Sequence, residues 1–159
     1  MRATLISWLI EVHMKFRLRT ETLYIAVSIL DRFCEKQEVR KDDFQLIGVT
    51  ALFIAAKYEE VSMQKIMDYV NITAMAYSRR EILNCEYQIL KQLDFEVGVP
   101  TAYRFLERYH SMSGGKRKVF SLACYISELC MLEATMNWWK PSRIASSCLY
   151  VARKLLKER

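Results

Sequence analysis

The sequence contains little glycine and proline and almost no histidine. Its 159 residues include 4 Gly, 2 Pro and 2 His. Turn-rich β sandwiches need more glycine and proline than this, so the composition favours helices joined by short loops. Hydrophobic residues make up 52% and charged residues 26% of the chain, which excludes a disordered or fibrous protein. We therefore expect an all-α globular protein.

The sequence also lacks the motifs of several functional classes. The longest run without a charged residue, Phe44–Ala56, is too short to span a membrane as a helix. The five cysteines form no CxxC pair, and His13 and His110 lack neighbours at the spacing of metal ligands. The paired Gly114 and Gly115 lack the spacing of a phosphate-binding loop. We expect no catalytic residue, no cofactor, no metal and no membrane contact.

The net charge of +6 permits nucleic acid or an acidic protein surface as partner, and by itself proves neither. The basic residues fall in small groups, which is typical of solvated helix faces and loop ends. The cysteines lie within apolar helical patterns, which is typical of reduced core residues in an intracellular protein. We expect the protein in the nucleus and the cytoplasm.

Apolar periodicity predicts five helices before residue 97. Thr20 is expected to cap the second helix, and Ser62 to start a short fourth one. Ser78 and Glu81 form an S-x-x-E capping box ahead of the fifth. The third helix is apolar on nearly every side and should be the buried centre. Pro100 is suited to the first turn of the helix that follows.

After residue 97 the apolar helical pattern of the first segment repeats. Shifted by 97 residues, IGVTALFIAAKY from Ile47 lies over IASSCLYVARKL from Ile144, and two earlier segments agree at the same offset. Three agreements indicate a duplicated helical unit. We place the first unit at residues 1–97 and a partial second copy, with helices 1 to 3 only, at residues 98–159. Counterparts of residues 62–95 are missing from that copy, so its central helix should lack cover on part of its apolar surface.

Two charged residues, Lys57 and Glu86, stand on apolar faces. Lys57 ends the most apolar helix, and Glu86 shares a helix face with Leu83 and Leu90. An unpaired buried charge costs several kcal/mol, so each residue needs a partner or a route to water. Lys57 either extends to solvent or Glu60, or it meets Glu86 on an exposed rim that binds another protein.

For Glu86 the alternative is a local pair with Lys91 or Arg79. A second pair of opposite charges, Arg2 and Asp31, lies on the first and second helices. We predict a buried salt bridge between them with a structural role.

These segments resemble the cyclins, and among them the B-type mitotic cyclins. MRATLISWL is similar to the opening MRAIL-x-x-WL pattern of the family, and ETLYIAVSILDRF, FQLIGVTALFIAAKYEE and REILNCEYQILKQLDFEVGVPTAYRFL follow in the family's order. The five positions that mark a cyclin box are matched by Arg2, Asp31, Leu46, Lys57 and Glu86. The resemblance implies a cyclin fold, with a five-helix cyclin box and a truncated second cyclin-like repeat.

The resemblance also implies a function. It predicts a non-catalytic regulatory subunit that binds and activates a cyclin-dependent Ser/Thr protein kinase at the G2/M transition. Lys57 and Glu86 would bind the kinase near its regulatory helix. The apolar contact positions around this pair are occupied by Ile54, Tyr58, Leu90 and Phe95.

The first helix resembles the family's substrate-docking patch for short basic-x-leucine motifs. The patch positions are matched by Met1, Leu5 and Trp8 in the apolar floor and by Glu11 and Gln45 at its polar edge. Without the resemblance, core packing is the preferred explanation for the three apolar residues. Thr4 and Ser7 depart from the family pattern, and Ser7 removes a charge that would attract a basic residue, so docking is expected to be weaker or altered.

Two other interpretations remain open. A cyclin-fold transcription factor of the TFIIB-like kind also has two helical repeats, and it would bind DNA and a polymerase assembly with strong salt dependence. An inactive truncated paralogue is the third possibility. The MRATL-x-x-W pattern and the Lys57/Glu86 pair favour a kinase partner without direct nucleic acid binding.

Overall fold

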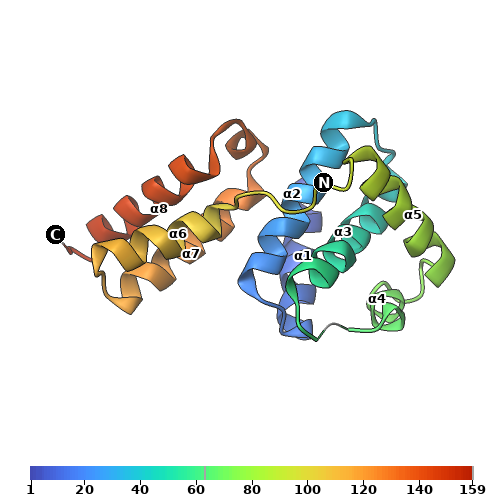
Figure 1. Ribbon diagram of the computed structural model, residues 1–159, viewed down its shortest axis with the longest axis horizontal. Helices are drawn as coiled ribbons and strands as arrows, with labels where there is room; N and C mark the ends of the chain where they lie inside the picture. Colours follow the sequence, from blue (N-terminus) through green and yellow to red (C-terminus); the bar gives the residue numbers. More distant parts are fainter. Residues whose placement is uncertain (63, 159) are drawn as a thin grey trace. The chain divides into compact units, whose positions relative to one another are not determined.

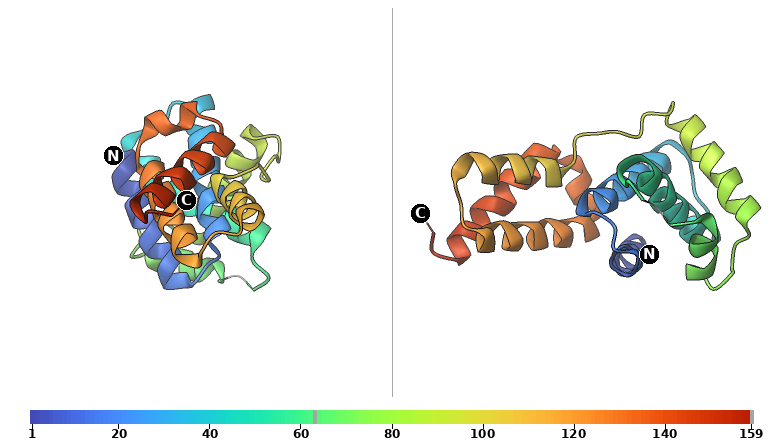
Figure 2. Two further views of the ribbon diagram at one scale, coloured as in Figure 1. Left: turned by 90° about the vertical axis from the view of Figure 1, so that its left-hand side faces the viewer. Right: turned by 60° about the horizontal axis from the view of Figure 1, so that its bottom comes forward.

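The computed structural model describes residues 1–62 and 64–158 (Figure 1). Arg159, which the sequence places at the end of the second repeat, lies outside them. The chain forms two compact units, Ala3–Val99 and the residues from Pro100 onward. The described residues form helices and turns and no strand, so the predicted all-α class is confirmed (Figure 2). None of the helices they form has both the length and the apolar character of a membrane span.

The first unit contains five α-helices around a buried centre. Its helices are α1 (Arg2–Phe16), α2 (Thr20–Lys36), α3 (Phe44–Glu59), α4 (Ile66–Ile72) and α5 (Arg79–Gln92), with a 3-10 turn η1 (Lys41–Asp43) before α3. Every residue from Ile47 to Ala56 of α3 is buried, as predicted for the central helix. Figure 1 shows α3 between α2 and α5, and both pack against it.

Gly48 lets α1 approach α3 closely. A methyl group at this position would lie 2.8 Å from Leu5 Cδ1, so a larger residue would push the leucine outward. Leu5 is 8% exposed and therefore belongs to the core. This close packing fixes the first helix on the central one.

The ends of two helices follow the expected chemistry. The Ser78 N–H donates to Glu81 Oε2 at 2.7 Å, and the Glu81 N–H donates back to Ser78 Oγ at 3.3 Å. The predicted capping box of α5 is confirmed. In the second unit Thr101 Oγ1 accepts the Arg104 N–H at 3.2 Å and caps the next helix. Pro100 stands one residue before this cap, so its predicted place in the first turn was wrong.

Two further helix starts differ from the sequence prediction. α4 begins at Ile66 rather than near Ser62, and the Lys65 N–H donates to the Asp68 carboxylate at 2.8 Å. α2 begins at Thr20, so Arg19 and not Thr20 is its cap residue. In both cases a carboxylate, rather than the hydroxyl of the expected residue, accepts a backbone N–H at the helix start.

At α2 the carboxylate comes from a distant segment. Glu60 Oε1 accepts the Arg19 N–H at 2.7 Å and the Thr22 hydroxyl at 2.6 Å. The first turn of a helix has N–H groups without helical partners and a partial positive charge, so a carboxylate is stabilised there. Glu60 thus joins the end of α3 to the beginning of α2.

The second unit repeats the first three helices. It consists of α6 (Ala102–Ser113), α7 (Arg117–Leu132), a 3-10 turn η2 (Ala134–Trp138) and α8 (Pro141–Leu155). Shifting α2 and α3 by 97 residues puts their first residues at 117 and 141, where α7 and α8 begin. The predicted duplication of a helical unit is therefore confirmed.

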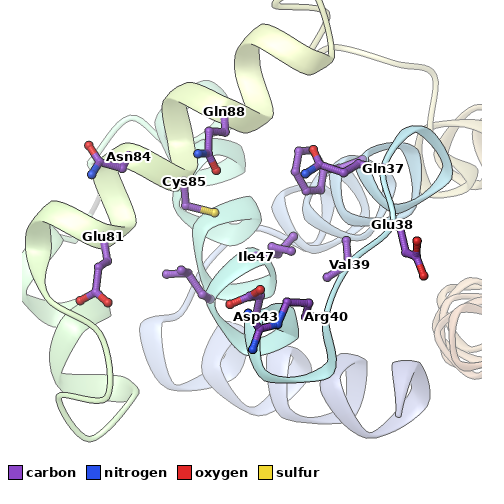
Figure 3. Close-up of a pocket in the computed structure, with 12 residues that line it drawn as sticks. Gln37, Glu38, Val39, Arg40, Asp43, Ile47, Glu81, Asn84, Cys85 and Gln88 are labelled. Carbon is purple, nitrogen blue, oxygen red and sulfur yellow. The ribbon is translucent and has the colours of Figure 1, made fainter.

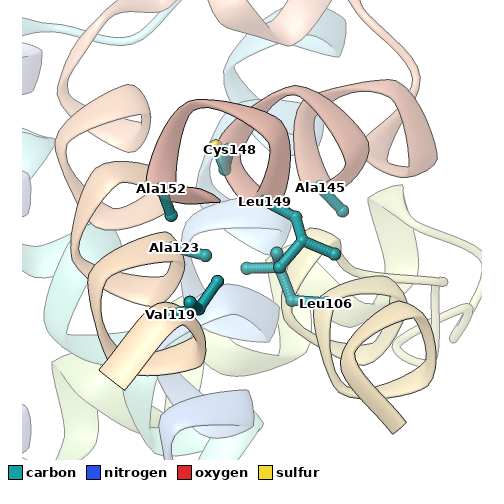
Figure 4. Close-up of a cluster of buried hydrophobic side chains, with 7 residues drawn as sticks. All are labelled: Leu106, Val119, Ala123, Ala145, Cys148, Leu149 and Ala152. Atoms are coloured by element: carbon teal, nitrogen blue, oxygen red, sulfur yellow. The ribbon is translucent and has the colours of Figure 1, made fainter. Parts of the chain in front are cut away.

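A small apolar core joins the three helices of the second unit (Figure 4). Its buried side chains are Leu106, Val119, Ala123, Ala145, Cys148, Leu149 and Ala152. The outer face of α8 is open, as expected. Tyr150 of α8 is 62% exposed, whereas Phe53, its counterpart at the 97-residue offset, is 5% exposed.

Candidate functional site

The structure brings Lys57 and Glu86 together. Lys57 lies in the last turn of α3, Glu86 lies on α5, and Lys57 Nζ forms an ion pair with Glu86 Oε1. The same ammonium lies 4.5 Å from the centre of the Phe53 ring. Of the partners considered from the sequence, Glu86 rather than Glu60 meets Lys57.

The pair extends from the core edge to the surface. The Glu86 side chain is 10% exposed and the Lys57 side chain 39% exposed. A carboxylate with so little access to water needs the ammonium, whereas the ammonium also reaches solvent. Part of the lysine's hydrogen-bonding capacity therefore remains available to another molecule.

Two aromatic residues that follow the members of the pair in the sequence are exposed: Tyr58 comes directly after Lys57, and Phe95 lies nine residues after Glu86. Tyr58 is 58% exposed and Phe95 67% exposed. The Tyr58 hydroxyl lies against the backbone of Gly98, where a methyl group would fall 2.2 Å from the oxygen. Only glycine lets the tyrosine rest on the segment that follows Phe95. Leu90, half-buried, lies one turn after Glu86.

We call the set Lys57, Tyr58, Glu86, Leu90 and Phe95 the Lys57–Glu86 surface. Ile54 was also predicted to contact the kinase, and that role stays a prediction. Ile54 is 3% exposed because it faces the core from α3. It can support the surface from beneath but offers little area to a partner.

Two further apolar residues of α5 that were not among the predicted contacts are also exposed. Leu83 and Tyr87 of α5 are 38% and 62% exposed. Together with Leu90 they follow the three- and four-residue spacing of one helix face. This stripe could have been found in the sequence, but apolar residues at helical spacing usually indicate core packing.

A cavity of about 380 Å³ lies elsewhere in the first unit, between the end of α2, the start of α3 and α5 (Figure 3). Phe33, Ile47 and Cys85 are the buried part of its wall, and burial raises the pKa of the Cys85 thiol. Charged and amide side chains such as Glu81 and Gln88 surround it. None of the residues predicted to bind a kinase or a substrate lines this cavity.

Comparison with known families decides the identity of the fold. The model of the cyclin N-terminal domain matches residues 1–98, and that of the cyclin C-terminal domain matches residues 100–159. The chain belongs to the cyclin family.

B-type cyclins are among its similar relatives. Cyclin-B2-3 of Arabidopsis thaliana is 42% identical over 99% of this chain, and G2/mitotic-specific cyclin-1 of Medicago sativa subsp. varia is 42% identical over 96%. Cyclin-A1-2 of Arabidopsis thaliana is 42% identical over 98%. The chain spans only 36–37% of the length of these relatives.

Solved structures share the cyclin fold. A viral cyclin from herpesvirus saimiri superposes with a TM-score of 0.87 at 20% identity, over 97% of this chain and 69% of that one. A chain of the yeast RNA polymerase II CTD kinase complex CTDK-1 superposes with a TM-score of 0.85 at 14% identity, over 99% of this chain and 56% of that one. At these identities the likeness concerns the fold alone.

The residues expected in the cyclin substrate-docking patch are only partly accessible. Met1 is 58% exposed and Glu11 is exposed, while Trp8 and Gln45 are half-buried. Leu5 is 8% exposed and packs against Gly48, and its place in the apolar floor of the patch stays a prediction.

The marker residues Arg2 and Asp31 are both half-buried. The salt bridge expected between them stays a prediction. The described residues hold no cluster of three or more His, Cys, Asp or Glu side chains suited to a metal ion.

Proposed function

We propose that this cyclin-family chain is a non-catalytic regulatory subunit that binds and activates a cyclin-dependent Ser/Thr kinase. The observation that carries the proposal is the Lys57–Glu86 ion pair, together with the exposure of the two predicted aromatic contact residues, Tyr58 and Phe95. Action at the G2/M transition is supported by the similarity to a relative named G2/mitotic-specific cyclin-1. A kinase partner is further supported by the CTD kinase complex that shares the fold.

The aromatic residues of the Lys57–Glu86 surface are of the kind that is enriched at protein interfaces. Large aromatic anchors supply most of the free energy of binding at such interfaces, and Tyr58 and Phe95 are of this type. Charged groups fix the register of the two chains more than they add affinity. Lys57, with a 39% exposed side chain, can therefore donate to the backbone of a kinase while Glu86 holds it in place.

Activation follows from differential binding. A subunit that binds the active conformation of a kinase more tightly than the inactive one shifts the kinase towards activity. In protein kinases this shift involves the αC helix, whose glutamate pairs with the catalytic-site lysine, and the activation loop. The cyclin chain contributes contacts to the active state, and the kinase performs the phosphoryl transfer.

Substrate docking is the second part of the proposal. Met1, Trp8, Glu11 and Gln45 would receive short basic-x-leucine motifs of substrates or inhibitors. The exposed Glu11 carboxylate is suited to a basic side chain. Leu5 supports the patch from the core, and Ser7 reduces its negative charge.

The test is a titration of the purified chain with a cyclin-dependent kinase, measuring Kd and phosphorylation of a histone-like substrate. We expect Lys57→Glu and Glu86→Lys each to weaken binding by about a hundredfold or more. Lys154→Glu is the matched control, because Lys154 is the repeat counterpart of Lys57 and lies 5.6 Å from the Tyr150 ring. Circular dichroism shows whether each variant keeps its helices.

Kinase affinity unchanged in both Lys57→Glu and Glu86→Lys would reject the surface. Failure of the folded wild-type chain to bind any such kinase would reject the proposed function. Binding to DNA that weakens steeply with salt would instead support the TFIIB-like alternative.

A further inference from the structure

α5 is followed by a tight turn, Leu93–Glu96, that carries Phe95. Asp94 and Phe95 have φ angles of 51° and 59°, in the left-handed region that residues other than glycine rarely adopt. The Phe95 N–H donates to the Leu90 carbonyl at 2.9 Å, and the Val97 N–H donates to the Phe95 carbonyl at 3.0 Å. Two successive residues in this region persist only where the surrounding structure holds them.

Two cations of α2 hold this turn. Arg32 Nη2 donates to the Glu96 carbonyl at 2.7 Å, and Lys36 Nζ donates to the Gln92 carbonyl at 3.0 Å. Gln92 is the last residue of α5, where carbonyls lack helical partners and the helix dipole favours a positive charge. The two donors therefore hold the residues immediately before and at the end of the turn.

The hydrogen bond from Arg32 is the stronger of these two interactions. Its 2.7 Å bond has the length of a charge-assisted hydrogen bond, and its planar guanidinium loses less freedom on binding than a lysine does. The Lys36 side chain is 48% exposed, and its ammonium lies 4.0 Å from Asp94 Oδ2. A surface pair at this distance contributes little.

We propose that Arg32 is a positioning residue of the Lys57–Glu86 surface: by holding the Glu96 carbonyl it keeps Phe95 in the orientation that a kinase binds. The inference rests on the proposed function. Phe95 is 67% exposed, so its neighbours on the surface do not fix it by burial. A loop ordered before binding loses less entropy when the complex forms, so Arg32 raises affinity without contacting the kinase.

The experiment compares Arg32→Met with Arg40→Met in the full chain. Methionine keeps the apolar stem and removes the donors, and Arg40 is a matched arginine whose Nη2 lies 3.9 Å from Asp42 Oδ2 on the surface. Amide hydrogen exchange of Phe95 and Val97 reports the turn in the free chain. We expect Arg32→Met to speed exchange at both amides by about tenfold, and Arg40→Met to leave it unchanged.

Kinase affinity supplies the second readout. Arg32→Met is expected to raise Kd by about tenfold on the wild-type background and to change it by less than about twofold on a Phe95→Ala background. A general loss of stability would act on both backgrounds alike. Arg32→Lys, which keeps the charge, should lie between wild type and Arg32→Met in both readouts, and it replaces Arg32→Met if the latter does not fold.

The outcomes separate the two proposals. Wild-type binding with an unchanged Kd in Arg32→Met, or equal effects on both backgrounds, overturns the positioning role and leaves the proposed function standing. Unchanged exchange at Phe95 and Val97 also overturns it. If the wild-type chain binds no kinase, the proposed function fails and the role of Arg32 in binding fails with it, whatever exchange shows.

Discussion

Glu60 places its carboxylate at the start of α2, and substituting this residue tests how much the contact stabilises the fold. Glu60→Ala removes two hydrogen bonds to an ionised acceptor, from the Arg19 N–H at 2.7 Å and the Thr22 hydroxyl at 2.6 Å. In Glu60→Ala the N–H of the exposed Arg19 can donate to water instead. Thr22 is 0% exposed, so its hydroxyl is left without an acceptor. Charged hydrogen bonds contribute about 1.5–3 kcal/mol, and an unsatisfied buried hydroxyl costs about 1–3 kcal/mol.

Glu60→Ala should therefore lower the free energy of unfolding of the first unit by about 2–3 kcal/mol. Glu60→Gln keeps an acceptor but loses the charge that favours the helix start, and should cost about 1 kcal/mol. In a double-mutant cycle with Thr22→Val, the coupling between Glu60 and Thr22 should be about 1–2 kcal/mol.

The assay is urea unfolding followed by the fluorescence of Trp8. Trp138 and Trp139 belong to the second unit and are exposed, so both are changed to phenylalanine in the reference chain. The fluorescence then reports the first unit alone. A cost below about 0.5 kcal/mol for Glu60→Ala, or a cycle that is additive, would refute the capping role.

Two further predictions concern buried groups. Tyr69 is 0% exposed, and within the part of the chain that the structure describes its hydroxyl has no hydrogen-bond partner. Tyr69→Phe should therefore leave the urea midpoint unchanged or raise it. A fall of more than about 1 kcal/mol in the free energy of unfolding would show that the hydroxyl is stabilising. Burial lowers the pKa of His13 below its usual 6.5, so the folded chain prefers neutral histidine. The contribution of neutral His13 to stability should be fully present above pH 6.5 and be lost as the pH falls from there through the folded pKa. Thermal melts of His13→Gln should therefore show a smaller fall in Tm on acidification than melts of the wild type. Equal falls in the two proteins would contradict this.

Periodicity and internal similarity predicted the elements that depend on many residues at once. The central helix, the duplication at a 97-residue offset and the capping box of Ser78 and Glu81 all have patterns that local chemistry enforces. The ion pair of Lys57 and Glu86 was one of several alternatives. The packing of α3 against α5 selects it, because each charge would otherwise lie at the edge of the core without a partner.

What the sequence did not reveal depends on groups that are distant or lack a residue-specific signal. Glu60 caps a helix that begins some 40 residues earlier, and Thr20 looked adequate for that position by itself. Arg32 donates to a backbone carbonyl, and any residue type can provide one. Leu5 and Ile54 fit both a core and a surface in the sequence, and only the packing of α1 and α3 shows that they are buried.

The central claim is that Lys57 and Glu86 form a binding rim rather than only a link between α3 and α5. The most direct test is the charge-swapped double variant Lys57→Glu/Glu86→Lys, measured for stability by urea unfolding and for kinase affinity by titration. The swap can restore an internal ion pair but presents the opposite charges to a partner. We predict that stability recovers relative to either single variant while kinase affinity stays at least about tenfold below wild type. Recovery of both would show that the pair only joins two helices and would contradict the account.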